Sequence, residues 1–370
     1  MPRLELQASL YGHKGAVWSV AWSPRGLLAS CGADKTVRVW HRAEGGAWRS
    51  VAVFGDATFV RAVRDLSWAS DGRSLACASF DASAFVLELM GGKTPHLEAA
   101  VSLEGHDSEV KSVAYSSSGA LLASCSRDKS VWVWEVGLDF DYECIAVLNG
   151  HAADVKMVAW HPTVEMLVST SFDGTVRVWV EDEDDWFCAE TLAGHNGTVW
   201  AAAFGEGGTG LATVAADGGL AIWSRENPPA NLAGANPAFQ VVARYPKLHA
   251  GPIYSVDWNK SNSLLATGGG DDCIRIIQCT EISSPNAPSE TSKTKEESTA
   301  NGSVPEQSAI TSNLKKRCEV MATEMRAHSG DVNRVAWNPI DQDILASSGD
   351  DGLVKIWKYC SDVDKKANGT

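Results

Sequence analysis

The sequence predicts an all-β fold, a seven-bladed β-propeller closed by its N-terminal strand, because two short motifs alternate along the 370 residues. In the first motif, a His is followed nine residues later by an aromatic residue. In the second, an Asp is followed six residues later by Trp or Ile in all but one copy. This Asp recurs at positions 34, 81, 128, 173, 217, 271 and 351. A spacing of roughly 45 residues, with insertions in the last two intervals, gives each copy room for four short strands.

The individual elements follow in chain order from these markers. Alternating runs such as LLASC and TVRVW, bounded by Gly and Asp turns, predict the strands. Residues 4–10 precede the first His and have no earlier blade to complete, whereas the last copy stops after its third strand at Trp357. We therefore expect the N-terminal strand to complete the last blade and to remove an exposed sheet edge. The single propeller should span 1–360 and leave a polar tail at 361–370.

Residues 280–316 interrupt the sixth copy between its third strand, which ends near Ile277, and its outer strand, which begins at Cys318. The segment carries 13 Ser or Thr residues and almost no large apolar residue. Such a composition cannot bury enough surface to offset the entropy of ordering it, so we expect a disordered loop. A tolerated insertion is the favoured interpretation, and a phosphorylated regulatory segment is the alternative.

Six of the seven copies share a set of four polar or aromatic residues: the His, a hydroxyl residue four before the Asp, the Asp itself, and the Trp or Ile. One copy alone resembles a catalytic Ser-His-Asp triad. Recurrence in six copies instead predicts a buried hydrogen-bond network that ties the strands of each blade together. The second copy has Phe59, Cys77, Asp81 and Leu87 at these positions, so that blade should depend on apolar packing. We expect no enzymatic activity.

The composition limits the classes of partner and the cellular compartment that we expect for this protein. The formal net charge of −14 disfavours nucleic-acid binding, and no apolar run approaches the roughly 20 residues of a membrane helix. The N-terminus lacks the basic and apolar segments of a secretory signal, which indicates the cytoplasm or the nucleus. The nine Cys show no metal-binding spacing, so we expect buried thiols rather than disulfides, and neither a metal nor a cofactor site.

Two recurring positions should present side chains at one end of the ring: the fifth residue after the His and the residue before the turn Asp. They place cations on copies two to four and aromatic residues among and beside them. Such side chains are enriched at binding hot spots and suit a peptide with an acidic group next to an aromatic one. In the alternative interpretation, Glu109 and Asp154 neutralise Lys111 and Lys156 as ordinary solvated ion pairs. The candidate partner-binding residues are Trp18, Arg64, Phe80, Lys111, Arg127, Lys156, Phe172, Trp200 and Tyr254.

The repeat resembles the WD40 family, and three stretches are more specific: CSRDKSVWVWEV (125–136), DYECIAVLNGHAADVKMVAWHP (141–162) and EDEDDWFCAETLAGHNGTVW (181–200). Together with GHKGAVWSVAWSP near the N-terminus, they resemble the WD40 subunit of the cytosolic iron-sulfur protein assembly (CIA) machinery. The similarity covers all seven copies apart from the 280–316 insertion.

This resemblance implies a non-catalytic scaffold of the CIA targeting complex, which delivers 4Fe–4S clusters to cytosolic and nuclear apoproteins. The implied partners are a small cluster-transfer subunit, a HEAT-repeat subunit, a hydrogenase-like iron-sulfur protein and the client apoproteins. The Arg of the SRDK turn, here Arg127, would belong to a surface needed for assembly. Clients of this family often end in an acidic-aromatic tail. Some animal members carry Leu-Tyr-Arg where this chain has Val178-Trp179-Val180, which puts recruitment of a cochaperone through that motif in doubt.

The alternative function is a WD40 substrate receptor of a ubiquitin ligase or a chromatin-peptide reader, which shared fold alone suggests. Against the ligase receptor, no strand-ending Trp of this chain begins a Trp-Asp-x-Arg sequence.

Overall fold

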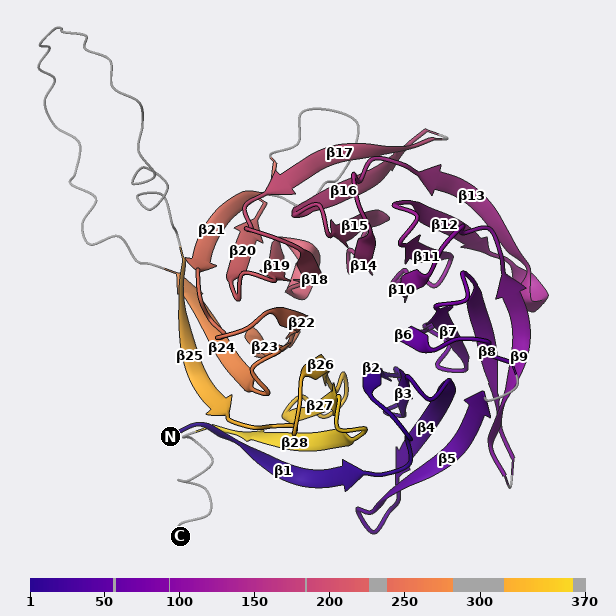
Figure 1. Ribbon diagram of the computed structural model, residues 1–370, viewed down its shortest axis with the longest axis horizontal. Coiled ribbons are helices and arrows are strands. Elements are labelled where there is room, and N and C mark those ends of the chain that lie inside the picture. Colours follow the sequence, from indigo (N-terminus) through magenta and orange to yellow (C-terminus); the bar gives the residue numbers. More distant parts are fainter. Residues whose placement is uncertain (56–57, 93, 184, 226–237, 282–315, 362–370) are drawn as a thin grey trace, which may run out of the picture.

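Seven antiparallel four-stranded sheets are arranged in a ring, so the all-β seven-bladed propeller is confirmed (Figure 1). The computed structural model describes residues 1–55, 58–92, 94–183, 185–225, 238–281 and 316–361. The first strand of each blade lies innermost in the ring and the fourth lies outermost (Figure 1).

The first four blades come from consecutive stretches of chain. Blade one consists of β2 (Val17–Trp22), β3 (Leu28–Gly32), β4 (Thr36–Arg42) and β5 (Trp48–Gly55). Blade two consists of β6 (Val63–Trp68), β7 (Ser74–Ser79), β8 (Ala84–Met90) and β9 (His96–Leu103). Blade three consists of β10 (Val110–Tyr115), β11 (Leu121–Ser126), β12 (Val131–Val136) and β13 (Tyr142–Leu148). Blade four consists of β14 (Val155–Trp160), β15 (Met166–Ser171), β16 (Thr175–Asp182) and β17 (Asp185–Ala193).

The last three blades follow the same order until the ring closes. Blade five consists of β18 (Val199–Phe204), β19 (Gly210–Ala215), β20 (Leu220–Ser224) and β21 (Gln240–Tyr245). Blade six consists of β22 (Ile253–Trp258), β23 (Leu264–Gly269), β24 (Ile274–Glu281) and β25 (Lys316–Glu324). Blade seven contains β26 (Val332–Trp337), β27 (Ile344–Gly349) and β28 (Val354–Cys360). Two short 3-10 helices, η1 (Leu138–Phe140) and η2 (Glu206–Gly208), lie in connecting segments.

The N-terminal strand β1 (Arg3–Leu10) supplies the outer strand of blade seven, as predicted. It pairs antiparallel with β28, and Leu6 lies opposite Trp357 in this register. Leu4 and Leu10 are buried in the closed ring. Closure therefore joins the two ends of the chain in one sheet and leaves blade seven without an open outer position.

The hydrophobic core lies between neighbouring blades. Second strands such as β11 and β15 are buried along their whole length, and these two consist of Leu, Ala, Val, Ser, Thr, Cys and Met. In one cluster, Val133 of blade three packs with Val158 and Leu167 of blade four. The outer strand β17 alternates between exposed and covered positions, because successive side chains point to opposite faces of the sheet and only one face is covered. Burial thus couples each blade to the next around the ring.

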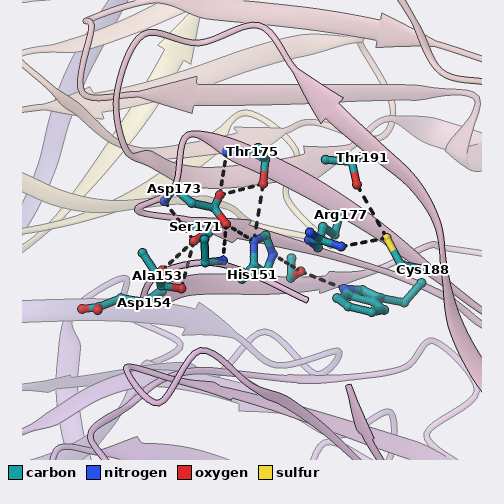
Figure 2. A network of polar contacts seen from close by, with 12 residues as sticks. His151, Ala153, Asp154, Ser171, Asp173, Thr175, Arg177, Cys188 and Thr191 are labelled. Atoms are coloured by element: carbon teal, nitrogen blue, oxygen red, sulfur yellow. Dashed lines mark hydrogen bonds and ion pairs between the residues drawn. The ribbon is translucent and has the colours of Figure 1, made fainter. Parts of the chain in front are cut away.

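The repeated polar set forms a buried network in six blades, as predicted. In blade four, the His151 imidazole bonds Asp173 through Nδ1 and Ser169 through Nε2, and Figure 2 shows it between the carboxylate and the strands beneath. A carboxylate only accepts, so Nδ1 donates to Asp173 and Nε2 accepts from the hydroxyl. Across the six blades, the Nδ1–carboxylate distance is 2.7–3.4 Å and the Nε2–hydroxyl distance is 2.7–2.9 Å.

Trp closes this network in five blades by donating its indole N–H to the same hydroxyl at 2.8–3.0 Å. Blade six has Ile277 instead, and there Arg275 donates to Asp271 at 2.9 Å. Blade two replaces the network by aromatic packing, as predicted. Its Phe59 is buried and meets Phe54 and Phe85 edge to face, with ring centroids 5.8 and 5.1 Å apart.

The turn that carries the network Asp needs a left-handed residue directly after it. Gly174 takes this position in blade four with φ of 82°, a conformation that costs Gly little. In blades one and three, Lys35 and Lys129 hold the same conformation with φ of 62° and 78°. The strand-to-strand connection is therefore the same in all three turns, although only one of them contains Gly.

The structure corrects the prediction for the cysteines. Cys279 of β24 and Cys318 of β25 lie directly opposite each other, with Cα atoms 4.0 Å apart, and form a disulfide. The expectation of free thiols throughout is wrong for this pair, because the register of the two strands aligns residues that are 39 positions apart. The seven other cysteines are free, and Cys144 is exposed rather than buried.

The strands on either side of the insertion extend further into it than the sequence indicated. Thr280, Glu281 and Lys316 belong to β24 and β25 rather than to the loop. The predicted disorder of the rest of the insertion falls on 282–315, outside the described residues, and so does the tail from 362 onward. Within the described ranges, no helix is long and apolar enough to cross a membrane.

Candidate functional site

One end of the ring contains a cavity of about 310 Å³, and the inner strand of each of the seven blades contributes a residue to its lining. The second residue of each inner strand is partly exposed here, whereas the residues beside it, such as Val17 and Ser19, are buried. The repeat therefore places one side chain per blade at the same depth. Seven of the nine candidate residues line this cavity: Trp18, Arg64, Phe80, Lys111, Lys156, Trp200 and Tyr254.

Aromatic rings form two opposite walls of the cavity. On the side of blades one and two, Trp18 and Phe80 lie with their ring centroids 5.1 Å apart. On the side of blades five and six, Trp200 and Tyr254 meet edge to face at 5.3 Å. Rings with one polar atom each, such as indole and phenol, offer apolar area together with a hydrogen-bonding group, which suits them to binding surfaces.

Three cations from blades two to four converge between these walls, each against an aromatic ring. The Arg64 guanidinium carbon lies 6.0 Å from the centroid of Trp18, and the Arg64 side chain also donates to the Trp18 carbonyl at 3.2 Å. Lys111 Nζ lies 4.0 Å from the Phe80 centroid. Lys156 Nζ lies 5.2 Å from the centroid of Trp200. Cation–π contact holds these charges in place without neutralising them.

The predicted neutralisation by neighbouring carboxylates holds for one of the two lysines. Lys156 Nζ lies 3.2 Å from Asp154. Lys111 makes no ion pair with any described residue, because Glu109 turns to Arg127 instead. Burial lowers the pKa of Lys111 to about 8, and the nearby positive charge of Lys156 acts in the same direction. Arg64 makes no ion pair with a described residue either, so two of the three cations in the cavity lack a carboxylate partner in the described part of the chain.

The far side of the cavity has the opposite charge. Asp331 and Asn333 of blade seven complete the lining, and Asn333 donates to Asp350 at 2.8 Å. Burial raises the pKa of Tyr254 to about 12, with a further contribution from the Asp331 carboxylate. Asn333 occupies the same repeat position as Trp18, so the periodicity indicated it. Asp331 lies outside both recurring positions, but it occupies the same repeat position as Glu109 and Asp154, so the periodicity could have indicated it.

Two of the nine candidates lie beside the cavity rather than in its lining. Phe172 is 59% exposed and contacts the Lys156 ammonium, with Nζ 5.3 Å from the ring centroid. The Arg127 side chain is 58% exposed, and its Nη1 lies 3.3 Å from Glu109. A second arginine, Arg61, reaches the same carboxylate at 3.4 Å. Sequence reasoning missed Arg61 because it lies outside the two recurring positions, unlike Arg64 and Phe80 of the same blade.

A second cavity of about 400 Å³ opens at the other end of the inner strands, where Trp22, Trp68, Trp258 and Trp337 end β2, β6, β22 and β26. Trp22 and Trp68 donate their indole N–H groups to the carbonyls of Ala336 and Ala21 in the preceding blades. These tryptophans therefore belong to the scaffold, as the sequence indicated.

The described side chains favour a binding site over a catalytic site. The six network His side chains are at most 4% exposed, so a substrate cannot reach them. Among the residues that the structure describes, no three His, Cys, Asp or Glu side chains come together as a metal site would require. The cavity with the cations and aromatic walls remains the candidate site, and its residues fit an anionic group next to an aromatic one.

Comparison with known proteins identifies six of the seven copies of the repeat and adds a relationship over nearly the whole chain. The family model of the WD domain, G-beta repeat, matches residues 4–41, 98–135, 142–180, 186–224, 242–278 and 319–358. The degraded copy in blade two lies mostly outside these segments.

Several curated proteins are similar over nearly their full length. "Probable cytosolic iron-sulfur protein assembly protein Ciao1" of Culex quinquefasciatus is 39% identical, with 98% of this chain and 100% of the relative covered. "Probable cytosolic iron-sulfur protein assembly protein CIAO1 homolog" of Caenorhabditis elegans is 40% identical, covering 92% and 94%. "Probable cytosolic iron-sulfur protein assembly protein 1" of Candida glabrata is 35% identical, covering 96% and 99%. The chain therefore belongs to the WD-repeat family and, within it, to the family of cytosolic iron-sulfur protein assembly proteins.

Proposed function

We propose that this protein is a non-catalytic scaffold of cytosolic iron-sulfur protein assembly, which brings protein partners together for the late insertion of 4Fe–4S clusters into apoproteins. The full-length similarity to proteins named for cytosolic iron-sulfur assembly carries this proposal. A rigid ring with buried polar networks and a preformed cavity supports a role in binding.

The partners we propose are the small cluster-transfer subunit, the HEAT-repeat subunit, the hydrogenase-like iron-sulfur protein and the client apoproteins. The protein would act in the cytoplasm and serve clients destined for the cytoplasm or the nucleus. It would hold no cluster itself, since clusters need several thiolates close together. The disulfide joins Cys279 to Cys318, and neither belongs to a group of metal ligands in the described part of the chain.

The cavity and its rim would bind an acidic-aromatic segment of a client or subunit. Lys111 offers an unpaired ammonium, while Trp18 and Trp200 offer ring faces on opposite walls. An anionic group of the partner would give Lys111 the counter-charge that no described residue supplies through an ion pair. The partner's aromatic ring would cover apolar area at the walls, which is the usual source of affinity at such sites.

Affinity purification of the tagged full-length chain, followed by quantitative mass spectrometry, tests the proposal. We expect iron-sulfur assembly subunits and iron-sulfur apoproteins among the enriched proteins, and loss of these proteins with Arg127→Glu. The matched control is Arg73→Glu. Arg73 is also half exposed and pairs with a carboxylate, Glu88, but it lies in the turn after β6, at the opposite end of the inner strand from Arg64.

Enrichment of ubiquitin-ligase adaptors or histones instead would overturn the scaffold role in iron-sulfur assembly in favour of the alternative functions. Full retention of partners by Arg127→Glu would refute the binding role of the rim. Circular dichroism and a thermal melt of both variants separate loss of binding from loss of fold.

A further inference from the structure

The disulfide between Cys279 and Cys318 joins the third and fourth strands of blade six, β24 and β25, close to their ends (Figure 1). Two residue pairs of the ladder follow it before the strands end: Thr280 with Arg317, and Glu281 with Lys316. Residues 282–315 then connect the strands. In blade four, the third strand ends at Asp182 and the fourth begins at Asp185. Blade six therefore has a covalent bond at the place where blade four has a short connection.

Among the described residues, few other side-chain contacts hold this end of the hairpin. The Thr280 hydroxyl donates to the Arg317 carbonyl at 3.5 Å, which is long for a hydrogen bond. Arg317 pairs with Glu319 of its own strand at 3.2 Å, and both side chains are more than half exposed. Exposed ion pairs contribute about 0–1 kcal/mol each. The disulfide is therefore the main side-chain link between the two strand ends.

Both half-cystines lie where a small thiol can reach them. β25 is the outermost strand of its blade, and Cys318 lies on it between the exposed residues Arg317 and Glu319. Cys279 and Cys318 are themselves only partly buried, and they pack at the edge of the apolar cluster that joins blades five and six. The bond therefore lies at the surface of the ring and not in its core.

The other cysteines of the chain differ from this pair. Cys31, Cys77 and Cys125 are completely buried in second strands, and burial raises the pKa of each thiol well above its ordinary value. The thiolate is the reactive form, so these thiols are unreactive while the protein is folded. Cys144 is exposed, but it forms no disulfide. Only Cys279 and Cys318 are both bonded to each other and accessible from solvent.

The proposed compartment decides what such a bond does. Thiol reductants keep most cytoplasmic cysteines reduced, and the disulfides that form there are mostly transient, catalytic or redox-sensing. A bond that only stabilised the fold would be expected in a secreted protein, and it would be buried or otherwise protected from exchange. The accessible bond of blade six has neither property.

We propose that Cys279 and Cys318 form a reversible redox site: reduced glutathione opens the bond, oxidised glutathione re-forms it, and the bond determines whether the end of the blade-six hairpin stays paired. This inference rests on the proposed cytoplasmic function and adds to it a site at which a thiol of the glutathione class reacts with the protein.

The reaction is thiol–disulfide exchange in two steps. The thiolate of one glutathione attacks a sulfur of the pair, releases the other cysteine as a thiolate and leaves a mixed disulfide. A second glutathione thiolate attacks the glutathione sulfur of that mixed disulfide, which forms oxidised glutathione and releases the second cysteine. Two electrons pass from two glutathione molecules to the pair, and the two protons that glutathione loses return to the cysteine thiolates through water. Oxidation is the reverse of these steps.

Thiol trapping of the purified full-length protein tests the site. The protein is equilibrated at different ratios of reduced to oxidised glutathione, and free thiols are blocked with N-ethylmaleimide. The remaining disulfides are then reduced, labelled with heavy N-ethylmaleimide and quantified by mass spectrometry. We expect Cys279 and Cys318 to be blocked together in reduced glutathione and protected together in oxidised glutathione. Cys144 is the control for accessibility, because it should carry either N-ethylmaleimide or glutathione at every ratio.

Hydrogen–deuterium exchange of the wild type in its two redox states measures what the bond does. Reduction should speed exchange of the amides at 279–281 and 316–318 by about tenfold or more, because the hairpin end loses its covalent closure. The end of the β16–β17 hairpin in blade four is the matched control without a disulfide, and its exchange should not change. The double variant Cys279→Ser with Cys318→Ser should exchange as the reduced wild type does in both buffers.

The redox site is refuted if reduced glutathione leaves the bond intact, since the disulfide is then a permanent structural link. N-ethylmaleimide blocking of both cysteines in oxidised glutathione would refute it as well. Equal exchange of the hairpin end in both states would overturn the conformational effect. None of these results bears on the proposed function, which the purification tests through the proteins that it enriches. Enrichment of ligase adaptors would in turn overturn that function and leave the glutathione result as measured.

Discussion

Replacement of Asp173 by Ala should strongly destabilise the propeller, because this carboxylate is the acceptor for most of the blade-four network. Its Oδ2 accepts from His151 Nδ1 at 2.8 Å and from the Ala152 amide at 2.9 Å. Its Oδ1 accepts from the Thr175 amide at 2.9 Å and from the Thr175 hydroxyl at 2.6 Å (Figure 2). The substitution leaves four donors without their acceptor.

The expected loss follows from which donors water can reach. The His151 side chain is 0% exposed, so its Nδ1–H keeps only the long contact with the Thr175 hydroxyl at 3.4 Å, and the loss of the carboxylate costs about 1–3 kcal/mol. The donors of Ala152 and Thr175 lie in turns near the surface, and each bond there contributes about 0.5–1.5 kcal/mol. We expect a total of about 3–5 kcal/mol, since water entering the vacated space restores part of the sum.

Asp81→Ala in blade two is the matched control at the same repeat position. Asp81 accepts from the amides of Val60 and Ser83, both at 3.3 Å, and from the Ser83 hydroxyl, but Phe59 stands where the other blades have His. We expect a loss of about 1–2 kcal/mol, because no buried imidazole loses its partner. Urea denaturation monitored by tryptophan fluorescence gives both values. Equal losses for the two variants would refute the role assigned to the buried His.

Three further predictions concern the whole ring. First, acid should destabilise it: burial lowers the pKa of His249 to about 4, whereas the contacts of Asp271 with His249, the Ala250 amide and Arg275 together outweigh burial and lower the pKa of Asp271 to about 2. Both folded-state pKa values lie below those of the unfolded chain, so the melting temperature should decrease as the pH is lowered from about 6.5 to 2. A higher melting temperature at pH 5 than at pH 7 would contradict this. Second, Cys279→Ser with Cys318→Ser should cost about 4 kcal/mol relative to the oxidised protein, because the disulfide closes a loop over a separation of 39 residues. A reductant should lower the melting temperature of the wild type but not of the double variant. Third, deletion of residues 1–10 should expose β28 and cause aggregation, visible as larger species in size-exclusion chromatography.

The repeat made most of the fold predictable. The turn Asp marked seven blades. In six copies, the His, the hydroxyl residue and the Trp or Ile predicted the networks, because residues at equivalent positions of a repeat make equivalent contacts in each blade. The same periodicity placed side chains such as Trp18 and Trp200 in the cavity, because equivalent positions in a ring point in equivalent directions.

Contacts that do not recur from blade to blade could not be predicted from the sequence. The pairing of Cys279 with Cys318 depends on the register of two strands separated by the insertion. The bridge from Glu109 to Arg61 crosses between blades, and spacing along one strand instead suggested Lys111 as its partner. In both cases the partner lies far away in the sequence, and three-dimensional distance decides the contact.

The closure of blade seven also governs the order in which the chain can finish folding. β1 is synthesised before all the other strands of the seven blades, whereas its partner β28 is synthesised after every other described strand. Leu4 and Leu10 therefore lack their final packing partners while the first six blades are synthesised, although both are at most 7% exposed in the finished ring. Contacts between residues this far apart in sequence form slowly, and an uncovered strand is open to pairing with other chains. In a newly made chain, β1 is thus open to pairing with other chains until β28 has been synthesised.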